Sequence, residues 1–200
     1  MILQYMEQHL SGERLQAEWS ALEAANASCE YSQAAALLPA NRLKNRRPSD
    51  RRTLPFDHSR VLLNDLHNEK GSDYVNASLL IDADPSRAAY VAAQSPLQDT
   101  IGDFWQMVWE QDCRVLVVLS GGKDEPNSVR YWPLQGAQRF GSLELRLVSE
   151  HYWTDAYMVR SFYLKHAPSG DTRTLTQLHL LCWPESSLPP SIDALLAFRR

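Results

Sequence analysis

The chain has 200 residues and a formal net charge of −4, and 44% of its residues are hydrophobic and 22% charged. This length and composition predict a globular chain with a real core and exclude a disordered one. The negative charge argues against general nucleic-acid binding, and no apolar run approaches the roughly 18 residues that a membrane span needs. Three cysteines without a pattern indicate a reducing compartment and no disulfide framework.

The first 40 residues are predicted to form an N-terminal helical segment, separate from a domain over residues 41–200. Within residues 1–27 we expect two helices with a break near Ser11-Gly12. Apolar residues recur there at three- and four-residue spacing, which is typical of amphipathic helices: Leu3, Met6 and Leu10, then Leu15, Trp19 and Leu22. Packing of these faces against the domain's own core is the simpler expectation, and a partner-binding helical pair is the alternative.

A basic stretch follows, in which six of the eleven residues from Arg42 to Arg52 are Lys or Arg. If these side chains converged, they would bind a phosphate group or an acidic lipid. A solvated loop is the commoner outcome for such a stretch.

From Arg60 onward the pattern is that of a mixed α/β domain. Thr100 to Asp103 have the spacing of a capping box and should open a helix with a broad apolar face that includes Trp105 and Trp109. Segments rich in β-branched and aromatic residues predict strands at Tyr74–Leu80, Ala89–Gln94, Val115–Leu119, Leu143–Ser149, Met158–Leu164 and Arg173–Leu181. The expected fold is a twisted mixed sheet flanked by helices.

The glycine pair Gly121-Gly122 and the triplet Ser169-Gly170-Asp171 predict turns. Ser191 is a plausible N-cap for a helix through Leu195 and Leu196. Because that apolar face has only begun when the sequence ends at Arg200, we expect the domain to be cut before its last helices.

Seven short motifs resemble the protein tyrosine phosphatase domain, in the family's order and over residues 41–185. They are Lys44-Asn45-Arg46, Pro55–Val61, Asp73–Ser78, Gln94–Leu97, Asp103–Glu110, Tyr131-Trp132-Pro133 and Trp183-Pro184. Further stretches, including Val159–Lys165 and Thr172–Gln177, are similar to the islet-cell autoantigen and phogrin branch of receptor-type phosphatase-like proteins of dense-core secretory vesicles.

The resemblance implies a site built from two loops. The substrate-binding residues would be Asn45, Arg46 and Arg47 of the recognition loop together with Gln94, and the acid loop would be Trp183-Pro184-Glu185. Arg47 stands where the family has a tyrosine that walls the substrate slot, and Glu185 stands where it has the general-acid aspartate. The longer glutamate displaces the carboxyl by roughly 1 Å, which can cost about a hundredfold in rate where positioning governs catalysis.

The family's nucleophile is a cysteine followed six positions later by an arginine that grips the phosphate. The residues six positions after Cys29, Cys113 and Cys182 are Ala35, Leu119 and Leu188. The six histidines show no metal-ligand spacing with the cysteines, so we expect no metal and no cofactor. His58, within the Asp-His-Ser-Arg motif, is predicted to have a structural hydrogen-bonding role.

The expected function is therefore a catalytically impaired phosphatase-like domain that acts through protein contacts, including other phosphatase-like receptors. The resemblance implies a place on the cytoplasmic face of secretory vesicles, with membrane attachment through a parent chain upstream and a role in cargo storage and regulated secretion. The alternative is an active phosphatase in a longer parent chain, acting on phosphotyrosine or a phosphoinositide.

Overall fold

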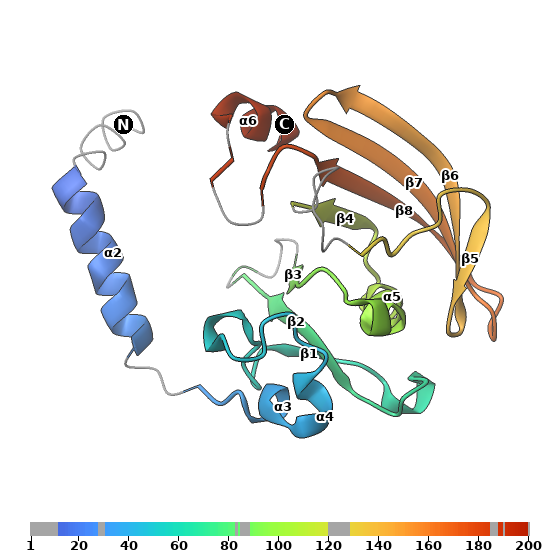
Figure 1. Ribbon diagram of the computed structural model, residues 1–200, viewed down its shortest axis with the longest axis horizontal. Coiled ribbons are helices and arrows are strands. Elements are labelled where there is room, and N and C mark those ends of the chain that lie inside the picture. The colour runs from blue at the N-terminus through green and yellow to red at the C-terminus, as the bar shows by residue number, and fades with distance from the viewer. Residues whose placement is uncertain are drawn as a thin grey trace.

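The computed structural model describes residues 12–27, 31–82, 84, 89–119, 129–184, 188–189 and 191–199, and shows the mixed α/β fold that the sequence predicts (Figure 1). Its α-helices are α2 (Gly12–Ala27), α3 (Ala34–Leu37), α4 (Pro39–Arg42), α5 (Ile101–Glu110) and α6 (Ile192–Arg199). Its strands are β1 (Arg60–Leu62), β2 (Tyr74–Leu80), β3 (Tyr90–Ala93), β4 (Val115–Val118), β5 (Ala137–Phe140), β6 (Leu143–Thr154), β7 (Tyr157–His166) and β8 (Thr172–Leu180). Short 3₁₀ turns lie at Arg51–Thr53, Asp65–His67 and Gln98–Thr100.

The described strands form two sheets and not the single sheet that the sequence predicts. An antiparallel three-stranded sheet has the order β1-β2-β3, and a five-stranded sheet has the order β4-β8-β7-β6-β5. In the larger sheet β4 and β8 are parallel and the other neighbours are antiparallel. Every predicted strand exists, but the patterns miss β1 and β5. β1 is only three residues long, and β5 is largely exposed and carries no apolar alternation.

Helix α5 joins the two sheets into one core. The smaller sheet contributes Val61 and Val75 to this core. The larger sheet contributes Leu145, Phe162 and Leu175. Between them lie the apolar residues of α5, of which Trp105 is fully buried and donates its indole Nε1–H to the carbonyl of Tyr131 at 2.7 Å. The predicted apolar face of this helix is therefore confirmed.

The predicted capping box at Thr100 and Asp103 is wrong. The Thr100 hydroxyl accepts a hydrogen bond from the Leu97 backbone N–H at 2.9 Å, and the Thr100 side chain makes no capping bond to α5. The Asp103 carboxylate does not reach back to the helix start. It faces inward and pairs with Lys44 at 2.9 Å. A buried cation is a stronger partner for a carboxylate than a backbone amide that water can solvate.

Helices α3 and α4 are held to the smaller sheet by Asp57. Its carboxylate accepts hydrogen bonds from the backbone N–H groups of Ala34 and Ala35, at 2.9 and 3.1 Å, and from the Ser32 hydroxyl. These bonds, chiefly that from Ser32, lower the pKa of Asp57. Its neighbour His58 is exposed; its ring stacks with Phe56 and packs at a tilt against Tyr31, with 5.9 and 4.4 Å between ring centroids. No hydrogen bond of the His58 ring is found among the described residues, so the predicted hydrogen-bonding role of His58 is replaced by aromatic packing.

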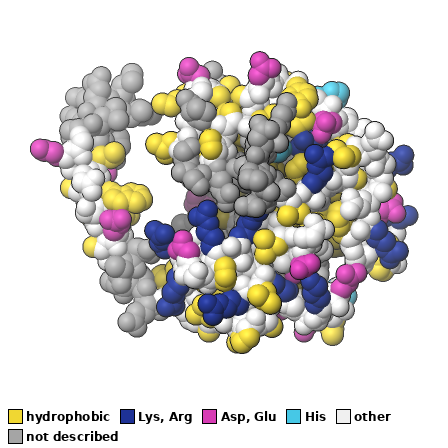
Figure 2. Space-filling view, viewed as in Figure 1, with side chains coloured by type: hydrophobic (Ala, Val, Ile, Leu, Met, Phe, Trp, Pro, Cys, Tyr) yellow, Lys and Arg dark blue, Asp and Glu magenta, His cyan; other side chains and the backbone are white. Residues whose placement is uncertain are grey.

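The expectation that α2 packs on the core is wrong. Leu15, Trp19 and Leu22 are 57%, 58% and 65% exposed. Figure 1 shows α2 standing apart from the sheets, and Figure 2 shows hydrophobic side chains open on its surface. The predicted helix before it, with Leu3, Met6 and Leu10, lies outside the described residues, as do the predicted turn at Gly121-Gly122 and Cys29.

The two other local predictions are confirmed. Gly170 has a φ of 76° in the turn between β7 and β8, a conformation that favours glycine. The Ser191 hydroxyl accepts from the backbone N–H of Ala194 at 3.2 Å, as an N-cap of α6 should. None of the described helices is long and apolar enough to cross a bilayer.

Candidate functional site

Asn45, a predicted substrate-binding residue, lies buried at the centre of the loop that follows α4, with 4% of its surface exposed. Its amide donates to the carbonyls of Asn41 and Ala36, at 3.0 and 3.4 Å. Its oxygen accepts from the Tyr74 hydroxyl at 2.7 Å and from the Asn76 amide at 2.8 Å. Burial raises the pKa of Tyr74 to about 12, so this hydroxyl remains a donor at neutral pH. The Asn45 side chain thus shapes the loop from within.

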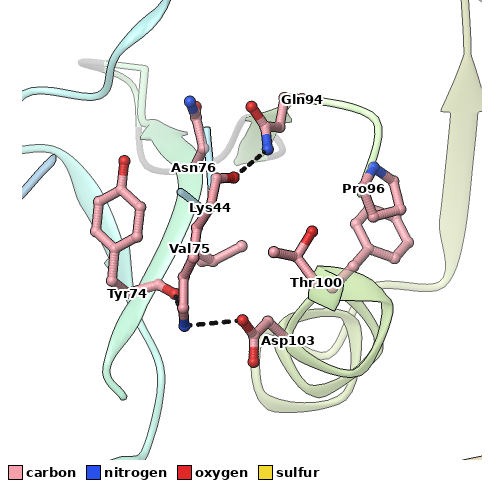
Figure 3. A pocket seen from close by; sticks show the side chains of 9 residues that line it. Lys44, Tyr74, Val75, Asn76, Gln94, Pro96, Thr100 and Asp103 are labelled. Atoms are coloured by element: carbon pink, nitrogen blue, oxygen red, sulfur yellow. Dashed lines mark hydrogen bonds and ion pairs between the residues drawn. The ribbon is translucent and has the colours of Figure 1, made fainter. Parts of the chain in front are cut away.

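Gln94, the next predicted residue, clamps the same loop from β3. Its amide nitrogen donates to the carbonyl of Lys44 at 2.7 Å (Figure 3), and its amide oxygen accepts from the backbone N–H of Arg46 at 3.0 Å. One side chain therefore fixes the backbone on both sides of Asn45. The structure gives Asn45 and Gln94 an internal role that determines where the loop lies, and their substrate-binding role stays a prediction.

Lys44 anchors the loop to α5, which sequence reasoning did not anticipate. Its ammonium group is 2.9 Å from the Asp103 carboxylate, and the two side chains are only 11% and 7% exposed (Figure 3). The ammonium group also donates to the Ser72 hydroxyl and the Tyr74 carbonyl, at 2.9 and 3.2 Å. The other Asp103 oxygen accepts from the Asn68 amide at 2.7 Å. Such a buried pair is favourable only when its remaining donors and acceptors are satisfied, as they are here.

A small pocket runs along this seam between the loop and α5. Its free space holds no more than about one water molecule. It is lined by Lys44, Tyr74, Val75, Asn76, Gln94, Pro96, Thr100, Asp103 and Phe104 (Figure 3). Because the charged groups on its wall are already paired with one another, this pocket is an internal packing seam and not a substrate site.

Arg46 and Arg47 complete the predicted recognition loop. The Arg46 side chain is half-buried, and Arg47, at the position of the family's tyrosine, is exposed. The rest of the basic stretch does not converge on one point, because Lys44 faces α5, Arg51 donates to the Gln33 amide oxygen at 3.1 Å, and Arg52 pairs with Asp50. The hydrogen bond from Arg52 lowers the pKa of the half-buried Asp50 carboxyl.

The predicted acid loop follows β8. The start of this loop is fixed by a hydrogen bond of 2.7 Å from the backbone N–H of Leu181 to the carbonyl of Ala156. Trp183 is half-buried and Pro184 is exposed, while Glu185 lies outside the described residues. The recognition loop follows α4 and is bonded to β2 of the smaller sheet, whereas the acid loop follows β8 of the larger sheet.

The described cysteines do not have the surroundings of a nucleophile. Cys113 is half-buried against the core, and burial raises the pKa of its thiol. A reactive cysteine needs the opposite shift, which cations and backbone N–H groups provide. Cys182 is half-buried where β8 ends. Neither residue supplies the chemistry that the family's missing motif would.

Comparison with known proteins agrees with this arrangement. The family model described as protein-tyrosine phosphatase matches residues 41–200. The chain is 47% identical over 206 residues to the human receptor-type tyrosine-protein phosphatase-like N, and 45% identical over 207 residues to the rat receptor-type tyrosine-protein phosphatase N2. In both cases all of this chain and 20% of the relative are covered, so the chain spans a fifth of these relatives' length.

A solved structure of PTPN18 in complex with HER2 phosphopeptides superposes with a TM-score of 0.83 at 30% identity, covering 98% of this chain and 69% of PTPN18. The resemblance to the islet-cell autoantigen and phogrin branch is confirmed by the two N-type relatives. The chain belongs to the protein tyrosine phosphatase family, in which receptor-type phosphatase-like N and phosphatase N2 are among its relatives.

Proposed function

We propose that this chain is a catalytically impaired phosphatase-like domain that acts through protein contacts. The observation that carries the proposal is the contrast between an intact scaffold and altered chemistry. Gln94 and Asn45 hold the recognition loop in place, yet its ring-stacking position is the exposed Arg47. Arginine can stack on an aromatic ring but cannot form the same narrow slot.

The acid position supports the same conclusion. Trp183-Pro184 is followed by Glu185 in place of aspartate, and no cysteine of the 200 residues has an arginine six positions later. Proton donation depends on a carboxyl placed within hydrogen-bond reach of the leaving oxygen. Each departure could be tolerated alone, but together they affect substrate positioning, proton donation and the nucleophile.

The proposed cellular setting is the cytoplasmic face of a secretory-vesicle membrane, which is what the resemblance to the islet-cell autoantigen and phogrin branch implies. The relatives' names, a receptor-type phosphatase-like protein and a receptor-type phosphatase, support membrane attachment through a parent chain. There the domain would take part in cargo storage and regulated secretion, with other phosphatase-like receptors as partners. The exposed apolar face of α2, at Leu15, Trp19 and Leu22, supports a role in protein contacts, because exposed apolar patches mark such surfaces.

We expect this 200-residue chain to show no measurable hydrolysis of an aryl phosphate. The reason is that no cysteine of the 200 residues belongs to a phosphate-gripping Cys-x5-Arg motif, and that burial raises the pKa of the Cys113 thiol. Phosphate release at neutral pH measures this directly, and Cys182→Ser and Cys113→Ser variants control for contaminating enzymes. Turnover that disappears in either variant would overturn the expectation.

One observation favours a second candidate, an active phosphatase in a longer chain acting on phosphotyrosine or a phosphoinositide. The recognition-loop scaffold is built as a substrate loop would need it, with Lys44, Asn45 and Arg46 fixed by internal bonds. The related PTPN18 structure contains phosphopeptides, which shows that a domain of this fold binds such ligands. A complete domain with a low but cysteine-dependent turnover would support this candidate.

A further inference from the structure

A buried arginine outside the recognition loop links three strands and a loop. Arg160 of β7 is 7% exposed. Its Nε donates to Glu150 of β6 at 2.5 Å, and its Nη1 donates to the amide oxygen of Gln177 of β8 at 2.8 Å. Strand register places these three residues in one row, since Arg160 is directly opposite both Glu150 and Gln177. The row lies on the sheet face that carries the core residue Phe162.

The same guanidinium reaches the loop before β5 and the end of β8. Its carbon lies 4.7 Å from the centroid of the Trp132 ring, within the range of a cation–π contact. Nη1 is also 3.0 Å from Nδ1 of His179, which is 4% exposed. The Trp132 and His179 rings meet edge to face, with centroids 5.9 Å apart. Arg160 therefore contacts His179 near the end of β8, directly before the segment at residues 181–184.

The chemistry of arginine determines the state of these partners. A guanidinium has five N–H donors and no acceptor, so Nδ1 of His179 must carry a lone pair and the ring proton must sit on Nε2. A proton on Nδ1 would place a donor against a donor at 3.0 Å, and a ring protonated on both nitrogens would also place a positive charge against the guanidinium.

Gln177 shows that Arg160 sets the local geometry. The residue is fully buried, and its Nε2 has no hydrogen-bond partner within the part of the chain that the structure describes. An unpaired buried donor is costly. Rotating the amide to change its surroundings would turn the NH₂ group toward the guanidinium and lose the bond to Oε1. The bond with Arg160 therefore outweighs the unmet donor and holds the amide in this orientation.

We propose that Arg160 is a positioning residue for residues 181–184, the segment that begins the acid loop, and that it acts by holding His179 in the neutral tautomer with the proton on Nε2. Its contacts with Glu150 and Trp132 connect the end of β8 to β6 and to the Tyr131–Pro133 loop. The backbone bond from Leu181 to Ala156 then starts the segment from a fixed point. The inference is independent of catalysis, because it concerns the sheet from which the loop departs.

Hydrogen exchange of this chain tests the proposal. In Arg160→Met and Arg160→Lys, exchange at the amides of residues 180–183 should rise at least about tenfold more than exchange at the amides of α5. Lysine is included because it keeps the charge but lacks the planar fork. Arg139→Met is the matched control, since Arg139 is an exposed residue of β5 whose Nε binds the Gly141 carbonyl, and it should leave residues 180–183 unchanged.

Several outcomes would overturn the proposal. A uniform rise that includes α5 would mean that Arg160 contributes only general stability. Wild-type protection in Arg160→Lys would mean that charge alone suffices. A nitrogen-15 NMR measurement on the unmodified chain does not depend on the variants folding, and Nδ1 of His179 should show the shift of an unprotonated ring nitrogen. A proton on Nδ1 would contradict the proposed tautomer directly.

Discussion

Replacing Lys44 by methionine is expected to destabilise the fold by about 3–5 kcal/mol. The substitution keeps much of the aliphatic stem but removes the ammonium group that pairs with Asp103, Ser72 and the Tyr74 carbonyl. The Asp103 carboxylate would then remain buried with Asn68 as its described partner. Because whole domains are stable by only about 5–15 kcal/mol, this is a large fraction of the total. Denaturant unfolding followed by tryptophan fluorescence measures the change.

Two further variants identify the cause of this loss. Lys70→Met is the matched control, since Lys70 donates to the Asp99 carbonyl at an exposed site, and it should cost no more than about 1 kcal/mol. Lys44→Met combined with Asp103→Leu should recover much of the stability, because replacing both members of a buried pair by apolar residues is often close to neutral. Equal losses in Lys44→Met and Lys70→Met would refute the role assigned to the buried pair.

In a longer chain that contains the complete domain, Glu185→Asp together with Arg47→Tyr is expected to raise phosphotyrosine turnover more than either change alone. The aspartate would bring the carboxyl back by roughly 1 Å, which is worth up to about a hundredfold. The tyrosine would restore a stacking wall worth about 0.5–1.5 kcal/mol. The two changes act on proton donation and on ring positioning, so their effects should at least add in free energy.

Steady-state kinetics separates the two contributions. The acid change should act mainly on kcat and the stacking change mainly on KM. Glu144→Asp, the same replacement at an exposed residue of β6, is the matched control and should leave both constants unchanged. If the double variant behaved as the unmodified protein, the limiting defect would lie in the nucleophile loop and not at residues 47 and 185.

Local sequence patterns predicted the helices and strands more accurately than they predicted the tertiary contacts between those helices and strands. The apolar face of α5 and the strand-favouring residues of β2 and β8, such as Tyr74 and Val75 in β2 and the three threonines of β8, depend on neighbouring residues, and the sequence shows them directly. Strand β5 has no such signal, because three of its four residues are exposed and only Phe140 packs against the core. The sequence also contained no indication that the apolar face of α2 is exposed. Hydrophobic periodicity shows that a helix has an apolar face but does not show what covers that face.

The candidate site illustrates the same division. The motifs identified the recognition loop, but not that Asn45 and Gln94 bond to the chain's own backbone. Lys44 and Asp103 are 59 residues apart in sequence, and a lysine in a basic stretch gives no indication that it is buried. The Asp103 carboxylate also fits a capping box by spacing. Whether Asp103 caps its helix or pairs with Lys44 depends on how closely α5 approaches the recognition loop. That approach is a tertiary contact, which a local pattern does not show.

The measurement that tests the central claim most directly is kcat/KM for a phosphotyrosine peptide, determined for a chain that contains these residues and continues through a complete phosphatase domain. An active member of the family, assayed with the same peptide, provides the reference. We predict that kcat/KM is at least about a hundredfold lower than that of the active member, because the acid carboxyl is displaced and the stacking wall is absent. A value within about tenfold of the reference, a difference of less than 1.4 kcal/mol in transition-state stabilisation, would contradict catalytic impairment.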